Sequence, residues 1–239
     1  MIPRIIHYCW FGRGEMPELA QKCVASWHKY MPDWEYKLWN EDNFDVNNNE
    51  YAKEAYEAGK FAFVSDYVRL WALCNEGGVY LDTDVEVFKS FDDLLHFSAF
   101  AGFEGSKYTP LGTCVMASEA HGLWVSEQLE NYCDRHFIKP DGSFDMSTNV
   151  QFISAKMCEN GFVQDDKEQD YKDLHILPVE WFSPRQTTGE YIRTDNTYCD
   201  HLGMSSWDDS SRSWKNIIAK VVGPKMLPRL IKIKRKLFG

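Results

Sequence analysis

Short apolar runs at three places in the first part of the chain have the length and pattern of β-strands. Residues 4–10 form one run, and residues 79–81 form a shorter one that leads directly into acidic residues. Residues 34–39 alternate strictly between the two sides of the backbone, which is typical of a strand with one buried face. That face would carry Trp34, Tyr36 and Leu38.

Between these runs, apolar residues recur every three or four positions, as they do on the buried face of a helix. One helix is predicted after Pro17, a residue that suits a first helical turn, and another from about Glu50. Residues 61–75 predict a buried helix that ends at Gly77 and Gly78, because glycine is common where helices end. The order strand, helix, strand, helix, strand predicts an α/β fold with a largely parallel sheet.

The second half of the chain has a less regular pattern. Helices are predicted over residues 123–135 and 150–158, an extended segment over residues 171–180, and loops over residues 183–213. No internal repeat or low-complexity linker divides the sequence, so we expect a single domain.

The composition is that of a globular protein, with 44% apolar and 26% charged residues in a chain of 239. Its charge is unevenly distributed. Residues 210–239 hold nine basic and no acidic side chains, which leaves residues 1–209 with 17 basic and 36 acidic ones. The acidic body argues against a protein that coats nucleic acid. We expect a domain over residues 1–209 and a separate basic tail over residues 210–239.

The tail interleaves apolar residues at roughly helical spacing with lysine and arginine. Such a segment is typical of a helix that lies on an anionic membrane surface. The alternative is a terminal helix that is solvated or packed against a partner. No signal peptide is legible, and no run approaches the roughly 18 apolar residues of a spanning helix, so we expect a cytoplasmic protein that is soluble or peripheral.

The seven cysteines and seven histidines form no pairs at metal-ligand spacing. An odd number of cysteines with no close pair indicates free thiols in a reducing cytoplasm. No zinc site is legible in the sequence.

Asp82 and Asp84 are the strongest local signal for chemistry. Residues two apart in an extended segment point the same way, and these two follow an apolar strand, where ligands bind in open α/β sheets. Two carboxylates directed at one point repel each other unless a cation lies between them. The pair therefore predicts a site for a hard divalent cation such as Mg²⁺ or Mn²⁺.

Asp66 and Arg69 lie three residues apart on the helix that precedes this strand, and therefore on one helical face. One interpretation is a solvated ion pair of little energetic weight. The other is a polar pair directed at a substrate, in which Asp66 accepts from sugar hydroxyls and Arg69 binds hydroxyls or phosphate.

Two segments carry a recognisable pattern: residues 63–73, and residues 77–84 with the sequence Gly-Gly-Val-Tyr-Leu-Asp-Thr-Asp. They resemble the signature of glycosyltransferase family 32, which includes bacterial capsular-polysaccharide transferases and fungal Golgi mannosyltransferases, and to which the clostridial glucosylating toxins are distantly related. Residues 5–12 resemble the first strand of that family, and residues 198–207 resemble its late histidine, serine and tryptophan element. The resemblance is specific over residues 2–95.

The resemblance implies a GT-A type fold, in which a Rossmann-like sheet with flanking helices binds a nucleotide-sugar in a single domain. It implies that Asp82 and Asp84 hold Mn²⁺ or Mg²⁺ against the donor diphosphate, with His201 as a third metal or diphosphate ligand. With the two metal-binding aspartates, Asp66 and Arg69 would form the catalytic set.

The resemblance also implies which residues bind the nucleotide-sugar. They are Trp10 on the base, Ser65, Asp66, Arg69 and Tyr80 on the sugar and ribose, Asp82 beside the metal, and Ser206 and Trp207 over the diphosphate. The family transfers sugars with retention of configuration. Glu104, Asn149 and Gln151 are open candidates for the residue that supports retention.

Together these residues predict a metal-dependent, retaining glycosyltransferase that moves a hexose or N-acetylhexosamine from a nucleotide-sugar to a cell-surface glycan. A UDP-sugar is favoured as donor, with GDP-mannose as the alternative. The expected acceptor is lipid-linked capsular polysaccharide or O-antigen, at the inner face of a bacterial cytoplasmic membrane. Two other functions stay open. One is a metal-dependent phosphohydrolase, which would require more metal ligands than Asp82 and Asp84 supply, and the other is a non-catalytic glycan-binding module.

Overall fold

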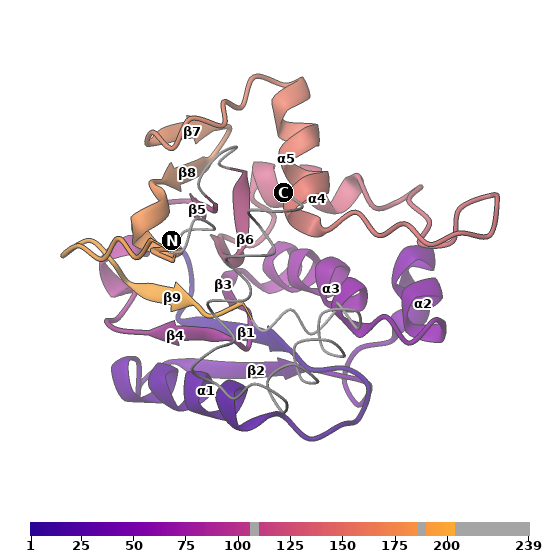
Figure 1. The fold of residues 1–239 in the computed structure, drawn as a ribbon, viewed down its shortest axis with the longest axis horizontal. Helices are drawn as coiled ribbons and strands as arrows, with labels where there is room; N and C mark the ends of the chain where they lie inside the picture. The colour runs from indigo at the N-terminus through magenta and orange to yellow at the C-terminus, as the bar shows by residue number, and fades with distance from the viewer. Residues whose placement is uncertain (106–109, 186–189, 204–239) are drawn as a thin grey trace, which may run out of the picture. The chain divides into compact units, whose positions relative to one another are not determined.

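A computed structural model describes residues 1–105, 110–185 and 190–203. These residues form one compact unit that ends at Gly203, and Figure 1 shows it as a twisted sheet with helices around it. The basic tail predicted for residues 210–239 lies outside the described residues, as do Ser206 and Trp207.

A seven-stranded sheet runs through the unit in the order β2-β1-β3-β6-β5-β8-β7. β1 is parallel to β2 and β3, whereas β6 is antiparallel to both of its neighbours, β3 and β5. A second, small sheet pairs β4 with β9 in antiparallel fashion. The strands are β1 (Ile5–Cys9), β2 (Glu35–Trp39), β3 (Gly78–Leu81), β4 (Val85–Val87), β5 (Ala99–Phe103), β6 (Leu111–Ser118), β7 (Gln169–Tyr171), β8 (Leu174–Leu177) and β9 (Cys199–His201).

Five α-helices in the described part of the chain pack around these strands. They are α1 (Glu18–Tyr30), α2 (Glu50–Glu57), α3 (Phe61–Glu76), α4 (Leu123–Glu130) and α5 (Asn149–Glu159). Their ends follow local sequence signals. Pro17 immediately precedes α1, Asn49 caps α2 by accepting a hydrogen bond from the Ala52 N–H, and Thr148 caps α5. Gly77 ends α3 with a φ of +68°, a conformation that favours glycine.

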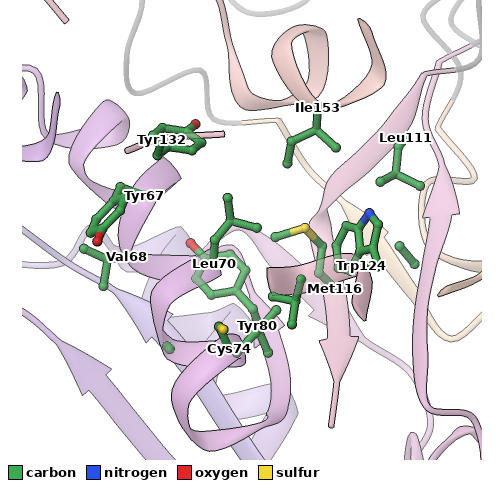
Figure 2. Packing of buried hydrophobic residues seen from close by; sticks show 14 of the residues in the cluster. Tyr67, Val68, Leu70, Cys74, Tyr80, Leu111, Met116, Trp124, Tyr132 and Ile153 are labelled. Carbon is green, nitrogen blue, oxygen red and sulfur yellow. The ribbon is translucent and has the colours of Figure 1, made fainter. Parts of the chain in front are cut away.

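Successive residues of β3 point to opposite faces of the sheet and enter two different cores. Val79 and Leu81 belong to the core on the side of α1, while Tyr80 belongs to the core on the side of α3. Figure 2 shows this second core, to which α3, β6, α4 and α5 contribute Tyr67, Val68, Leu70, Cys74, Leu111, Met116, Trp124 and Ile153. Because both faces of β3 are covered, its end and the residues that follow it are held in a fixed position.

The α/β class with flanking helices is confirmed, but the sheet is mixed rather than largely parallel. The cause is β6, which returns from β5 and inserts between β5 and β3. Both strands of this pair are buried along their whole length, so their residues do not alternate between apolar and polar, and the sequence pattern did not reveal them.

Smaller differences also follow from short or buried elements. The helix predicted over residues 123–135 ends at Glu130, and the extended segment predicted over residues 171–180 overlaps β7 and β8. The region predicted as loops over residues 183–213 contains β9, which at three residues is too short to produce a pattern.

The seven cysteines are free, as predicted, with Cys133 and Cys158 exposed and the other five buried. Within the described residues, no helix is long and apolar enough to cross a membrane.

Candidate active site

Two aspartates follow β3 where the strand leaves the sheet. Asp82 and Asp84 lie in the turn between β3 and β4, which is closed by a 3.0 Å hydrogen bond from the Val85 N–H to the Asp82 carbonyl. Tyr80 Oη donates to Asp82 Oδ1 at 2.9 Å. The Asp82 N–H donates to the carbonyl of Cys114 on β6, also at 2.9 Å. The turn and the Asp82 carboxylate are thus anchored beyond the carboxyl end of a buried strand, where ligands bind in α/β sheets.

His201 reaches the same place from a distant part of the sequence. β9 pairs with β4 so that His201 lies opposite Val85, and the Leu202 N–H donates to the Asp84 carbonyl at 3.0 Å. His201 Nε2 lies 3.4 Å from Asp84 Oδ1. One potential ligand atom from each of Asp82, Asp84 and His201 lies within 4.8 Å of the other two. The structure therefore brings together the three side chains that the family resemblance implied as metal ligands.

This set of donor atoms fits a hard divalent cation. Mn²⁺ and Mg²⁺ accept carboxylate oxygens, and an imidazole nitrogen is a compatible additional ligand for Mn²⁺. Burial lowers the pKa of His201, but the neighbouring Cys114, Asp84 and Glu104 outweigh burial and hold that pKa well above its ordinary value. The surroundings of His201 therefore favour positive charge, which either a proton or a metal cation can supply.

Arg69 holds the acidic residues of the site together from within α3. It is 5% exposed and Asp66 is 8% exposed, which excludes the solvated ion pair considered from the sequence. Arg69 Nη2 lies 3.1 Å from Asp66 Oδ1 and 3.1 Å from Asp82 Oδ1. Its Nη1 donates to the Thr113 carbonyl at 2.8 Å, and the guanidinium lies 4.6 Å from the centroid of the Tyr80 ring.

Burial changes the proton affinities of this network. It raises the pKa of Asp66 to about 6, although Arg69 opposes the change. It also raises the pKa of Asp82 against the same arginine. Burial alone would lower the pKa of Arg69, but the acidic neighbours prevail and the pKa lies well above its ordinary value. Arg69 is therefore a permanent cation, whereas Asp66 changes its charge close to neutral pH.

Asn149, the first residue of α5, contacts Asp66 through both its backbone and its side chain. Its N–H donates to Asp66 Oδ2 at 3.2 Å, and its Nδ2 donates to the Asp66 carbonyl at 3.1 Å. Its Oδ1 accepts from Tyr132 Oη at 2.9 Å. From the sequence, Asn149 was only one of three candidates for the residue that supports retention. The cap at Thr148 indicates where a helix begins, but it does not indicate which residues that end of the helix contacts.

The other two candidates for that step have different surroundings. Glu104 lies beside the metal-ligand cluster, with Oε1 3.5 Å from His201 Nδ1. The side chain of Gln151 is exposed and accepts from the Thr148 N–H at 3.1 Å, so it serves the helix cap.

Two residues predicted to bind the donor make local hydrogen bonds. Trp10 directly follows β1 and donates from Nε1 to the Gly14 carbonyl at 2.7 Å. Ser65 Oγ lies within α3 and donates to the Phe61 carbonyl at 3.2 Å. Both are partly buried, and their contacts with a donor stay predictions.

Residues 17–101 match a family model described as the glycosyltransferase sugar-binding region containing the DXD motif. The matched range contains the four residues Asp66, Arg69, Asp82 and Asp84.

The chain is 36% identical over 192 residues to glucan organizing enzyme 1 of Cryptococcus neoformans, covering 69% of this chain and 50% of the relative. It is 31% identical over 219 residues to inositol phosphoceramide mannosyltransferase 1 of Schizosaccharomyces pombe, covering 86% of this chain and 62% of the relative. It thus spans less than two thirds of either relative. A solved glycosyltransferase involved in glycosylation of the major capsid of PBCV-1 aligns with 13% identity and a TM-score of 0.45, over 85% of this chain and 96% of that chain.

Proposed function

This chain is a relative of glycosyltransferase family 32 with a GT-A type α/β fold, and from that premise we propose that it transfers a sugar from a nucleotide-sugar donor to a glycan acceptor. The observation that carries the proposal is the convergence of Asp82, Asp84 and His201 next to the buried pair of Asp66 and Arg69. Asp82, Asp84 and His201 would bind the cation, and the buried pair of Asp66 and Arg69 contacts this site directly through Asp82.

The charges of the reaction match those of the site. Breaking a sugar–diphosphate bond leaves negative charge on the diphosphate and develops positive charge on the sugar ring. A divalent cation held by Asp82 and Asp84 supplies Lewis-acid stabilisation for the leaving diphosphate when it is bound. Asp66 carries negative charge above its pKa of about 6 and stabilises the developing charge on the sugar.

Arg69 keeps this arrangement in place. Its guanidinium contacts both Asp66 and Asp82, and the Thr113 carbonyl fixes one of its nitrogens. The two carboxylates therefore keep a constant orientation, which is the preorganisation that makes charged groups effective in catalysis.

For the donor, we propose a hexose or N-acetylhexosamine nucleotide, with GDP-mannose and UDP-sugars tested first. The fission yeast relative is an inositol phosphoceramide mannosyltransferase, which supports mannose as the first sugar to test and a phosphoinositol-containing lipid as the first acceptor. Lipid-linked capsular polysaccharide or O-antigen, expected from the sequence, stays a second prediction. Transfer with retention is proposed for either acceptor.

A panel of nucleotide-sugars with Mn²⁺, in which released nucleoside diphosphate is measured, tests the proposal. We expect turnover with at least one donor, its loss on chelation of the metal, and its loss in Asp84→Asn. The matched control is Asp33→Asn, which removes an exposed carboxylate outside the site and should keep full activity. Release of inorganic phosphate from sugar phosphates would instead identify a phosphohydrolase, and glycan binding without turnover would identify a binding module.

The stereochemistry has its own measurement. Proton NMR of the first sugar product should show the anomeric configuration of the donor, and an inverted configuration would exclude the retaining mechanism.

For localisation, we propose peripheral contact of residues 210–239 with the inner face of a bacterial cytoplasmic membrane, based on the nine basic residues of this segment. Flotation with anionic vesicles should recover the full chain but not a chain cut after Ser213. Equal recovery of both would contradict this role for the tail.

A further inference from the structure

A second cluster of metal-ligating side chains lies beside the aspartate turn. Glu104, Cys114 and His201 each place one potential ligand atom within 4.8 Å of the other two. They come from three separate places in the fold: the residue that follows β5, the middle of β6 and the end of β9. The sequence shows no metal-ligand spacing among them, so only the fold brings these residues together.

An irregularity of β6 sets the position of Cys114. Ala101 of β5 pairs with Met116, whereas Phe103 pairs with Leu111, so β6 carries extra residues, including Cys114, between these two pairs. Such a bulge redirects the side chains of the strand that contains it. The bulge is held on its other side by the Asp82 N–H, which donates to the Cys114 carbonyl.

Glu104 occupies space that a glycine leaves open. A Cβ atom at Gly112 would lie 3.2 Å from Glu104 Cβ and 3.4 Å from Glu104 Oε2. Glu104 therefore packs directly against the position where a side chain at residue 112 would begin. Glu104 Oε1 reaches His201 Nδ1 at 3.5 Å, while the other nitrogen of that ring faces Asp84.

Cys114 differs from an ordinary core cysteine in what surrounds its thiol. It is 2% exposed, and its Sγ makes a weak 3.7 Å contact with Ser183 Oγ. Small buried thiols are common in apolar cores. The Cys114 thiol instead lies among a carboxylate and an imidazole, and sulfur, imidazole nitrogen and carboxylate oxygen are each ligands that zinc accepts.

We propose that Glu104, Cys114 and His201 bind a thiophilic divalent cation such as Zn²⁺, at a site distinct from the one formed by Asp82 and Asp84. Thiolate sulfur selects zinc over magnesium and manganese, which prefer oxygen ligands. On binding, the cation displaces the proton of the Cys114 thiol to the solvent.

The two sites share His201, and a neutral imidazole offers a lone pair on only one of its two nitrogens, so the neutral ring binds one cation at a time. Zn²⁺ at the sulfur-containing site would therefore compete with the catalytic cation for that ligand. This competition rests on the proposed function, whereas binding of the thiophilic cation does not.

Cobalt(II) is the probe for binding, because it occupies zinc sites and a cobalt–thiolate bond absorbs in the near ultraviolet. We expect that band in the wild-type protein, its loss in Cys114→Ser, and its persistence in the control Cys133→Ser, which removes an exposed cysteine. Absence of the band in the wild-type protein, or its persistence in Cys114→Ser, would overturn the site.

Glu104→Gln provides a second variant that alters only a partly exposed side chain. It should retain the thiolate band but weaken cobalt affinity by at least about tenfold, the loss that follows even when an outer partner of a metal ligand is removed. Unchanged affinity in this variant would remove Glu104 from the site. Glu104→Gln and a thermal melt of Cys114→Ser together show whether a lost cobalt signal reflects a lost ligand or an unfolded protein.

Competition is then measured with Mn²⁺-dependent turnover in the presence of rising Zn²⁺. We expect inhibition of the wild type and at least about tenfold weaker inhibition of Cys114→Ser. Equal inhibition of both would refute competition through this site. A protein that shows the cobalt band but no turnover with any nucleotide-sugar would contradict the proposed function and leave the cation site intact.

Discussion

Replacing Asp66 by asparagine should make the protein more stable relative to wild type as the pH rises, while it abolishes sugar transfer. Burial raises the pKa of Asp66 from 3.8 to about 6, so the folded state disfavours the ionised carboxylate relative to the unfolded chain. The stabilising contribution of the protonated group is complete below pH 3.8 and is lost as the pH rises through about 6. At about 1.4 kcal/mol per pKa unit, the wild type loses about 3 kcal/mol over this range.

The assay is urea unfolding of wild type and Asp66→Asn at pH 4 and at pH 8. Because asparagine does not ionise, the variant should gain about 2–3 kcal/mol relative to wild type between these two conditions. Asp145→Asn is the control without a pH-dependent difference. Although burial opposes it, hydrogen bonds from Ser147 and Arg135 lower the pKa of Asp145 below 3.8, so the stability contribution of this carboxylate is lost only as the pH falls below about 4. The difference between this variant and wild type should therefore stay nearly constant from pH 4 to pH 8. A difference between wild type and Asp66→Asn that stays constant from pH 4 to pH 8 would refute the reasoning.

Three further substitutions test the network around Asp66 and Asp82. Arg69→Met leaves the buried carboxylate of Asp66 and the half-buried carboxylate of Asp82 without their cation and should cost about 3–5 kcal/mol in urea unfolding; a cost below about 1 kcal/mol would show that the pairing is not needed. Tyr80→Phe removes the hydrogen bond to Asp82 and should cost about 1.5–3 kcal/mol, again by urea unfolding, since the acceptor is charged; no change would contradict that bond. Asn149→Ala removes the side-chain contacts to Tyr132 and to the Asp66 carbonyl, and it should lower turnover as well as stability; unchanged turnover would exclude Asn149 as a positioning residue.

The parts of this molecule that the sequence predicted are those with a local pattern. The buried helix before Gly77, the strand that follows it and the carboxylates of Asp82 and Asp84 all lie within one short segment. Helical spacing, a glycine stop and an apolar run depend only on near neighbours, so they are visible in a single sequence. For Asp66 and Arg69 the sequence left two interpretations open. Their burial now excludes the solvated ion pair, whereas their contact with a substrate stays a prediction.

The parts that the sequence did not predict depend on pairing between distant segments. β9 has only three residues and no recognisable pattern, so the sequence placed His201 at the metal site only through the family resemblance; the pairing of β9 with β4 brings His201 to Asp84. The contact between Asn149 and Asp66 likewise requires α5 to start beside α3. For the same reason the sequence did not predict a zinc site. Cys114 lies next to His201 only because of the bulge in β6, which the sequence pattern does not reveal. Such contacts follow from register and topology, which periodicity does not encode.

The central claim is that Asp82 and Asp84 bind a cation that in turn holds a nucleotide-sugar. Calorimetric titration of GDP-mannose and a set of UDP-sugars into the full chain, with and without Mn²⁺, tests it most directly. The account predicts binding of at least one donor that requires Mn²⁺, is lost in Asp84→Asn and is retained in Asp33→Asn. Binding of equal strength without the metal, or in Asp84→Asn, would contradict the claim, as would a failure of every donor to bind.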